Sequence, residues 1–417
     1  MSCFKIKGPK VLKGEVKISG AKNAALPIIF ASILASEEII LNNIPVLEDT
    51  KAAIEILKSL GAEVEFIDNT LRINPKSINK TLVSYEMSSK MRASIWLLPA
   101  LLAKYKEATI FLPGGCVIGK RPVDMHIAAL RALNANIILD NLKIEAKGEN
   151  LVSSKIIFSK VSVGATISAV IAGSLTKGIT TLLNCAIEPE VIDLVEFLNE
   201  LGAKIEVSDT TIVIYGVEKL HGGTYKIIPD RIEAGSFLIA AAISKGHIKC
   251  TNLNPNNLKS VLEVLKLSGV SIEVGDDFII ASNPYNSLKA IDISTQPYPG
   301  FPTDMQAQFS LLNMLSEGEA IIEENIFENR YMHVNELKKM GVNADIRGKY
   351  LYTKGVSSLV SSTVRSTDLR ASISLVLAGI VANGETIVES IYHIDRGYEN
   401  IEAKLSSLGA DIERVEL

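Results

Sequence analysis

The sequence predicts an α/β protein built from six copies of one strand–helix–strand–helix–strand unit, grouped as two lobes of three units each. Three observations lead to this fold class: a short phrase recurs six times, its spacing is nearly constant, and an apolar helix precedes each copy. A chain of 417 residues is also too long for one ordinary core, and its size suits roughly two to three domains.

The recurring phrase has the general form Leu-Gly-Ala followed by alternating residues. Its second position is Gly61, Asn134, Gly202, Gly269, Gly341 and Gly409 in the six copies. The steps between these positions are 73, 68, 67, 72 and 68 residues. A fixed period of this kind predicts repeated copies of one supersecondary unit.

The elements of each unit follow from residue patterns around the phrase. An amphipathic helix precedes each copy, as at residues 50–60 and 400–408, and a strand pattern follows. The Gly or Asn in second position fits the left-handed residue that ends a helix. Further upstream lies a helix that is apolar on nearly all sides, as at 165–175 and 371–381, so it must be buried. A turn such as Lys177-Gly178 ends that helix, and a strand follows.

Six units divide into two lobes, and residues 220–229 are the best candidate for a crossover between them. We expect a cleft there. The alternative is a binding solenoid, whose copies would repeat the same surface residues. These copies share core residues and differ at the starts of their helices, which favours an enzyme.

Composition excludes several function classes. The formal net charge of -4 argues against general affinity for nucleic acid or for an anionic membrane. The best apolar run, residues 26–35, is far shorter than the ~20 residues needed to span a bilayer, and the N-terminus lacks the apolar core of a signal peptide. Four widely spaced cysteines show neither metal nor disulfide spacing. We therefore expect a cytoplasmic protein.

The predicted helix starts carry the residues that differ most between copies. Asp230, Asp304 and Asp368 stand where N-caps are expected, and N-capping is their default interpretation. Five cations also lie near predicted helix starts, where the helix dipole disfavours them unless an anion is bound between them. They are Lys22, Arg92, Arg121, Arg370 and Arg396. We interpret them as a phosphate-binding cleft; the alternative is solvated surface ion pairs.

The loop around Cys116 carries a second set of unusual residues. It contains Gly114, Gly115 and Gly119, and Lys120 and Arg121 favour the thiolate form of Cys116. We therefore favour a chemical role for Cys116 and interpret Cys185 and Cys250 as core residues. Residues 114–120 also match part of a nucleotide-binding P-loop. However, Arg121 stands where that motif needs Ser or Thr, which argues against nucleoside-triphosphate hydrolysis.

Several long motifs in order resemble one family from end to end. They are Gly20-Ala21-Lys22-Asn23-Ala24, residues 113–126, Pro229-Asp230-Arg231-Ile232-Glu233, residues 301–308, Glu328-Asn329-Arg330, Asp368-Leu369-Arg370-Ala371 and His393-Ile394-Asp395-Arg396-Gly397-Tyr398. They resemble the UDP-N-acetylglucosamine 1-carboxyvinyltransferase family of enolpyruvyl transferases. The resemblance implies an inside-out α/β barrel in each lobe, with the first strand completing the C-terminal lobe. It implies an N-terminal lobe of residues 22–229 and a C-terminal lobe of residues 1–21 plus 230–417.

The resemblance also implies a reaction. The enolpyruvyl group of phosphoenolpyruvate would pass to the 3'-hydroxyl of UDP-N-acetylglucosamine, releasing phosphate, in the first committed step of peptidoglycan synthesis. It implies these two substrates, no metal or organic cofactor, and no obligate protein partner. The alternative enzyme is the sister transferase acting on shikimate 3-phosphate, which resembles this fold but does not use the Gly-Gly-Cys loop.

The family's site residues carry over by position. Phosphoenolpyruvate would be held by Lys22, Arg121 and Arg396, with Asn23 orienting the reacting centre. The UDP-sugar would contact Arg92, Arg121, Pro122, Val123, Asp124, Met125, Lys160, Val161, Ser162, Val163 and Ile326. Arg330 and Arg370 join the substrate-binding set. Asp304 would be the general base. Cys116 would protonate the methylene carbon of phosphoenolpyruvate, form a covalent adduct, and be alkylated by fosfomycin.

Overall fold

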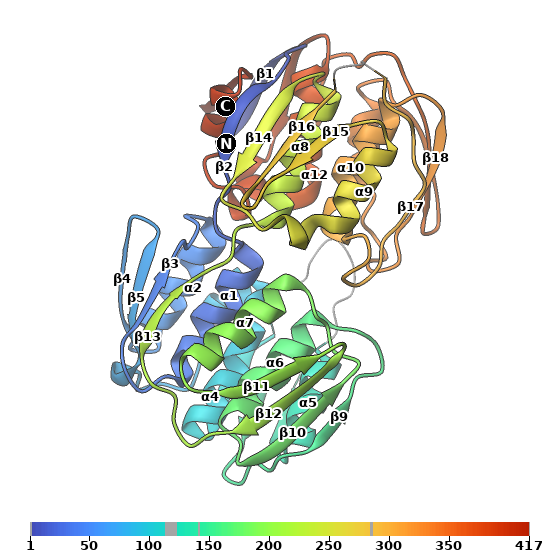
Figure 1. Ribbon diagram of the computed structural model, residues 1–417. Coiled ribbons are helices and arrows are strands. Elements are labelled where there is room, and N and C mark those ends of the chain that lie inside the picture. Colours follow the sequence, from blue (N-terminus) through green and yellow to red (C-terminus); the bar gives the residue numbers. More distant parts are fainter. Residues whose placement is uncertain (1, 113–122, 141, 284–286, 417) are drawn as a thin grey trace. The chain divides into compact units, whose positions relative to one another are not determined.

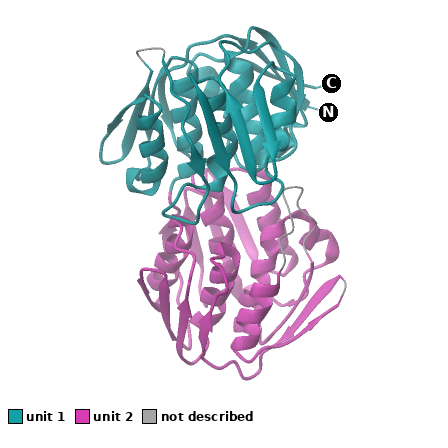
Figure 2. Cartoon of the chain, turned by 90° about the vertical axis from the view of Figure 1, so that its right-hand side faces the viewer, with its two compact units in different colours: residues 1–19, 117–119, 229–417 teal, residues 20–116, 120–228 magenta. Residues whose placement is uncertain are grey.

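The computed structural model describes residues 2–112, 123–140, 142–283 and 287–416. Within these ranges the chain forms two compact units (Figure 2). Unit 1 contains residues 2–19 and 229–416, and unit 2 contains residues 20–112 and 123–228. Three predicted site residues, Cys116, Arg121 and Pro122, lie outside the described ranges.

The strands of the described chain form six sheets, three in each unit (Figure 1). This confirms the prediction of six repeated units. In unit 2 the sheet orders are β13 (Gly223–Lys226), β3 (Ile39–Asn42), β5 (Thr70–Asn74), β4 (Glu63–Ile67); β9 (Lys155–Ile157), β10 (Gly178–Leu183), β12 (Thr211–Gly216), β11 (Lys204–Ser208); and β6 (Glu107–Phe111), β8 (Lys143–Lys147), β7 (Asn136–Leu139). A single parallel bridge between Leu82 and Thr109 stands where the last sheet would have its fourth strand.

The sheets of unit 1 follow the same plan. Their orders are β2 (Lys13–Lys17), β14 (His247–Thr251), β16 (Phe278–Ser282), β15 (Ser271–Val274); β17 (Ile293–Ser294), β18 (Glu319–Glu323), β20 (Tyr350–Lys354), β19 (Asn343–Arg347); and β21 (Thr363–Arg365), β22 (Gly384–Glu389), β1 (Ser2–Gly8), β23 (Asp411–Glu416). Each begins with a parallel pair and continues antiparallel. Strand β1 pairs with β22 and β23, so the start of the chain completes the last sheet of unit 1.

Six helices are buried along most of their length, as their all-apolar sequences predict. In unit 2 they are α1 (Lys22–Ala31), α4 (Leu97–Tyr105) and α6 (Val163–Ser174), and in unit 1 they are α8 (Arg231–Ile243), α10 (Gln306–Met314) and α12 (Leu369–Val381). Helices α8, α10 and α12 contact one another, and α4 contacts both α1 and α6. Each unit therefore has helices inside and sheets outside, which is the inside-out α/β barrel that was expected.

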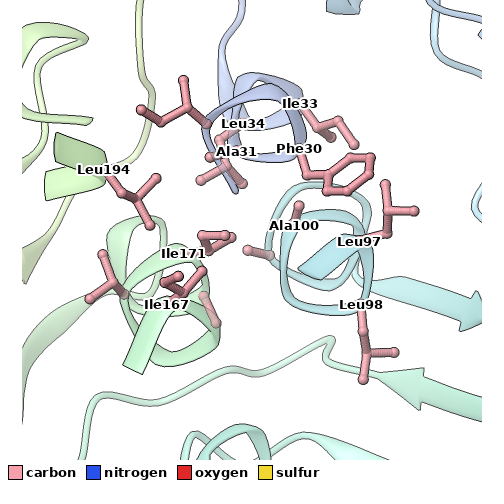
Figure 3. Close-up of a cluster of buried hydrophobic side chains, with 14 of the residues drawn as sticks. Phe30, Ala31, Ile33, Leu34, Leu97, Leu98, Ala100, Ile167, Ile171 and Leu194 are labelled. Atoms are coloured by element: carbon pink, nitrogen blue, oxygen red, sulfur yellow. The ribbon is translucent and has the colours of Figure 1, made fainter. Parts of the chain in front are cut away.

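Figure 3 shows this interior in unit 2. Phe30 and Ala31 of α1 lie near Ala100 of α4, and Ile167 and Ile171 of α6 fill the space beside them. Each of these five residues is at most 1% exposed. Because burial of apolar area drives folding, this helical interior holds the three sheets of the unit together.

Amphipathic helices pack against the buried ones, as α5 (Asp124–Ala132) does on α6 and α2 (Glu48–Ser59) does on α1. The others are α7 (Pro189–Glu200), α9 (Lys259–Leu267), α11 (Met332–Lys338) and α13 (Ile401–Ser407). A further helix, α3 (Tyr85–Lys90), and six 3-10 helices complete the described elements: η1 (Ser32–Leu34), η2 (Pro75–Ser77), η3 (Arg92–Trp96), η4 (Pro255–Leu258), η5 (Thr303–Met305) and η6 (Ile391–Arg396). Among the helices described, none is long and apolar enough to cross a bilayer.

The second residue of the repeated phrase is left-handed in all six copies. The φ angles are 102° at Gly61, 68° at Asn134, 95° at Gly202, 94° at Gly269, 91° at Gly341 and 100° at Gly409. Glycine adopts this region without a Cβ penalty, and asparagine tolerates it best among the other residues. The recurrence of this one backbone requirement explains why the repeat is visible in the sequence.

Candidate functional site

Asp304 is held between two buried arginines of unit 1. Its Oδ1 accepts a hydrogen bond of 2.6 Å from Nη2 of Arg330, and its Oδ2 accepts one of 2.7 Å from Nη2 of Arg370. The side chains of Arg330 and Arg370 are 4% and 5% exposed, whereas that of Asp304 is 25% exposed. The carboxylate is therefore the accessible end of an otherwise buried charge cluster.

The two arginines determine the charge state of Asp304. Burial alone would raise the pKa of this carboxyl, but Arg370 and Arg330 outweigh it and bring the pKa well below its ordinary value. Asp304 is thus ionised at neutral pH. A carboxylate oxygen can accept more than one hydrogen bond, so the two arginine bonds do not by themselves use up the acceptor capacity of the group.

Asp304 does not cap a helix, whereas Asp230 and Asp368 do. Oδ1 of Asp230 accepts hydrogen bonds from the backbone amides of Ile232, at 2.8 Å, and Glu233, at 3.1 Å, and so caps α8. Oδ1 of Asp368 accepts bonds of 2.8 and 3.0 Å from the first turn of α12. Asp304 lies inside η5 and caps neither η5 nor α10. The N-cap interpretation is confirmed for Asp230 and Asp368 and wrong for Asp304.

Glu324 organises the segment next to Asp304, and the sequence analysis missed it. Thr303 donates its hydroxyl proton to the Glu324 carboxylate, at 2.9 and 3.0 Å from its two oxygens. Oε1 of Glu324 also accepts bonds from the amides of Ile326, at 2.9 Å, and Phe327, at 3.0 Å. Glu324 therefore connects Thr303, which precedes Asp304, with the loop that carries Ile326. A single glutamate after β18 offers no sequence pattern by which to recognise this role.

Arg396 lies in a different local setting from the one expected. Helix α13 begins at Ile401, close to the predicted start at residue 400, and Arg396 lies before it as the last residue of η6. A cation at the C-terminal end of a helix is favourable, so the predicted conflict with a helix N-terminus is wrong for this residue. Asp395 is occupied by a two-bond pair with Arg414, at 2.9 and 2.7 Å. Arg396 nevertheless belongs to the element that packs against α12, which carries Arg370.

Lys22 and Asn23 form the start of α1 in unit 2, as expected. Nζ of Lys22 lies 3.3 Å from Oδ2 of Asp49 in α2. Their side chains are 13% and 8% exposed, so this is not a solvated surface pair. Arg92 is likewise the first residue of η3. The expected placement at a helix start is therefore confirmed for Lys22, Arg92 and Arg370, which is the second residue of α12.

Residues 123–125 and 160–163, which are predicted to contact the UDP-sugar, lie at two adjoining helix starts of unit 2. Val123 is the N-cap of α5, with Asp124 and Met125 in its first turn. Lys160 and Val161 lead into Ser162, which caps α6 through a 3.3 Å bond from the Ala165 amide, and Val163 begins the helix.

Contacts around His126 bring these two helix starts together. Nδ1 of His126 in α5 lies 2.8 Å from Oγ of Ser168 in α6. A Cβ on Gly164 would lie 2.8 Å from the His126 ring, so a glycine is needed at that position. Burial, and secondly the charge of Arg92, lower the pKa of His126 to about 4. Arg92 therefore belongs to the same neighbourhood.

The predicted site residues thus form two described groups. Unit 2 holds Lys22, Asn23, Arg92, residues 123–125 and residues 160–163, and unit 1 holds Asp304, Ile326, Arg330, Arg370 and Arg396. Throughout the described ranges there is no group of three or more His, Cys, Asp and Glu residues placed to hold a metal ion.

Comparison with known proteins places this arrangement in a family. Residues 6–405 match the family model of EPSP synthase (3-phosphoshikimate 1-carboxyvinyltransferase). The chain is 51% identical over 417 residues to the UDP-N-acetylglucosamine 1-carboxyvinyltransferase of Proteus mirabilis, covering 100% of this chain and 99% of that protein. It is 52% identical over 419 residues to the protein of the same name from Vibrio campbellii, with coverage of 100% and 99%.

Solved structures share the fold along the whole chain. The enolpyruvyl transferase NikO of Streptomyces tendae matches with a TM-score of 0.89 at 25% identity, covering 99% of each chain. EPSP synthase of Acinetobacter baumannii matches in fold with a TM-score of 0.79 at 18% identity, covering 100% of each chain. These matches confirm the resemblance drawn from the motifs: the chain belongs to the UDP-N-acetylglucosamine 1-carboxyvinyltransferase family of enolpyruvyl transferases.

Proposed function

We propose that this protein transfers the enolpyruvyl group of phosphoenolpyruvate to the 3'-hydroxyl of UDP-N-acetylglucosamine and releases phosphate, the first committed step of peptidoglycan synthesis. The observation that carries the proposal is the ionised carboxylate of Asp304, exposed at one end of a buried arginine pair. It stands in a chain 51% identical, over its whole length, to a protein named for this transfer.

Asp304 acts in the proposed reaction as the base for the acceptor hydroxyl. Its ionised state leaves it ready to take a proton, but its two arginines also make it a weak base. An anionic substrate that draws on Arg330 or Arg370 weakens their hold on the carboxylate and raises its pKa. Substrate binding therefore strengthens the base at the moment when it is needed.

The covalent steps balance without an oxidant or reductant. The 3'-oxygen bonds to C2 of phosphoenolpyruvate as Asp304 takes the hydroxyl proton and Cys116 gives a proton to the methylene carbon. The resulting methyl group then returns a proton to the Cys116 thiolate, the double bond reforms, and the bond from C2 to the phosphate oxygen breaks. Inorganic phosphate leaves, and the proton of the acceptor hydroxyl leaves with it or passes to solvent.

Binding in this proposal depends on cations and helix starts. Phosphoenolpyruvate is held by Lys22, Arg121 and Arg396 and oriented by Asn23. Arg330 and Arg370 also bind substrate, and charge-assisted bonds of this kind contribute roughly 1.5 to 3 kcal/mol each.

The UDP-sugar is bound by a larger set of residues. It contacts Arg92, residues 121–125, residues 160–163 and Ile326. We assign residues 22–229 and residues 1–21 with 230–417 to the two lobes, assign the protein to the cytoplasm, and propose a reaction without a metal or organic cofactor.

The sister reaction on shikimate 3-phosphate is the second candidate, since the family model carries that enzyme's description. Initial rates of phosphate release with phosphoenolpyruvate and each acceptor in turn separate the two. We expect release with UDP-N-acetylglucosamine and none above background with shikimate 3-phosphate. The opposite preference, or no release by folded protein with either acceptor, would overturn the proposal.

A further inference from the structure

A chain of buried polar side chains lies behind the Asp304 cluster in unit 1. Counted over whole residues, Arg370 is 4% exposed, Tyr398 and Ser236 are each 2% exposed, and Gln308 is 0% exposed. These residues come from α12, the segment after η6, α8 and α10, so the chain joins the three buried helices of the unit. The transfer reaction described above assigns no role to Tyr398, Ser236 or Gln308.

The directions of the hydrogen bonds in this chain can be derived from the number of protons available. The single hydroxyl proton of Ser236 is donated to the carbonyl oxygen of Ile232 at 2.8 Å. The 2.8 Å bond between Ser236 Oγ and Tyr398 Oη must therefore be donated by Tyr398. Gln308 Nε2 donates to both oxygens, at 3.1 Å to Ser236 and 3.3 Å to Tyr398.

With its proton turned toward Ser236, the Tyr398 oxygen offers lone pairs to Arg370. Nη1 of Arg370 lies 3.4 Å from Tyr398 Oη, and the guanidinium carbon lies 5.7 Å from the centre of the Tyr398 ring. Arg370 is thus contacted by both the hydroxyl and the ring of Tyr398. Burial raises the pKa of Tyr398 despite the opposing charge of Arg370, so the hydroxyl keeps its proton.

The guanidinium is planar, so fixing one nitrogen fixes the direction of the others. Nη1 is directed at Tyr398 Oη, and Nη2 is directed at Asp304 Oδ2 at 2.7 Å. Rotation of Arg370 away from Tyr398 would also turn Nη2 away from the carboxylate.

We propose that Tyr398 is a positioning residue for the transfer reaction: its hydroxyl, oriented by Ser236 and Gln308, holds Arg370 in the rotation that directs Nη2 at Asp304. The inference rests on the proposed function, because Asp304 is the base only in that reaction. Tyr398 contacts neither the base nor, in this proposal, a substrate. It acts through Arg370.

The charged groups around Asp304 and Arg370 determine whether the pKa of Asp304 rises or falls when Tyr398 is changed. Asp304 faces Arg330 and Arg370, and Arg370 faces Asp304, Tyr398 and Asp230. Loosening Arg370 leaves Arg330 as the main cation beside Asp304. The pKa of Asp304 then rises, and the carboxylate is less precisely oriented.

The test compares wild-type protein with Tyr398→Phe, which removes the hydroxyl and keeps the ring over Arg370. We expect kcat to fall about tenfold, both KM values to change less than about twofold, and the acid limb of the pH profile to move to higher pH. Tyr331→Phe is the matched control. Tyr331 is 6% exposed, and its hydroxyl bonds the carbonyl oxygens of Ile322, at 2.8 Å, and Lys349, at 3.0 Å.

Further variants make the outcomes distinct. In an Arg370→Lys background, Tyr398→Phe should have no additional effect on kcat, because the planar group that it orients is gone. If Tyr398→Phe does not fold, Ser236→Ala tests the same chain and should shift the pH profile in the same direction. An inactive wild type would defeat the proposed function. If the wild type is active but Tyr398→Phe has the same kcat and the same pH profile, the positioning role alone is overturned. The same criterion applies to Ser236→Ala if that variant is used.

Discussion

Nη2 of Arg370 and Oδ2 of Asp304 lie 2.7 Å apart, although 66 positions separate the two residues in the sequence. Arg330 approaches the other carboxylate oxygen from 26 positions away. Two buried cations thus hold one accessible anion, and removal of Asp304 would leave both buried arginines without this carboxylate.

Asp304→Asn should lower kcat by at least about 100-fold, because the amide cannot take the hydroxyl proton. Binding of UDP-N-acetylglucosamine, measured by titration calorimetry, should persist. Asp345→Asn is the control, since that carboxylate is 57% exposed and pairs with the exposed Arg347 at 2.9 Å. Equal loss of turnover and binding in Asp304→Asn would instead make Asp304 a structural residue.

Arg330→Gln should destabilise the protein by roughly 1.5 to 3 kcal/mol, because it removes a buried charge-assisted hydrogen bond to the Asp304 carboxylate. Arg330 is 5% exposed and also donates a 2.8 Å bond to Thr303. Urea unfolding measures the change. Arg347→Gln, at a side chain 68% exposed, should leave the midpoint unchanged. Similar midpoints for both variants would contradict the assigned role of the buried pair.

His126 should make stability depend on pH between about 4 and 6.5. Its pKa falls from 6.5 in the unfolded chain to about 4 in the folded one, so the unfolded state binds a proton first as pH falls. The stabilisation is present above pH 6.5 and is lost as pH falls toward 4. The unfolding free energy of wild type relative to His126→Gln should therefore decrease over this range by about 3 kcal/mol. A difference independent of pH would show that His126 is not buried in its neutral form.

Cys116 should be alkylated by fosfomycin, because Lys120 and Arg121 follow it closely in the sequence and favour ionisation of the thiol to the nucleophilic form. Mass spectrometry of the tryptic peptide after incubation measures the modification. Cys185, which is 1% exposed and whose pKa is raised by burial to about 12, is an internal control and should stay unmodified. An unmodified Cys116 peptide would argue against its predicted role.

The repeat was predictable because its cause is local. A left-handed residue after each amphipathic helix restricts the sequence at that position, as the φ of 102° at Gly61 and of 68° at Asn134 illustrate. The buried helices were predictable for a similar reason, since a helix that is apolar on all sides has no stable exposed form. Both features appear within a short window of sequence.

The site was only partly predictable because its contacts are distant in sequence. Asp230 and Asp304 stand in similar local sequence, yet only Asp230 caps a helix, and the arginines that distinguish Asp304 lie far along the chain. The role of Tyr398 likewise depends on Ser236, 162 positions away. Arg396 was misplaced because the 3-10 helix η6, which ends at Arg396, was not predicted before α13.

The most direct test of the central claim is the identity of the product. Purified protein is incubated with phosphoenolpyruvate and UDP-N-acetylglucosamine without added metal, and the nucleotide-sugar and phosphate are then quantified by mass spectrometry and a phosphate assay. We predict one inorganic phosphate for each UDP-N-acetylglucosamine that gains an enolpyruvyl group at its 3'-oxygen. Phosphate release with an unchanged nucleotide-sugar, or no reaction by folded protein, would contradict the account.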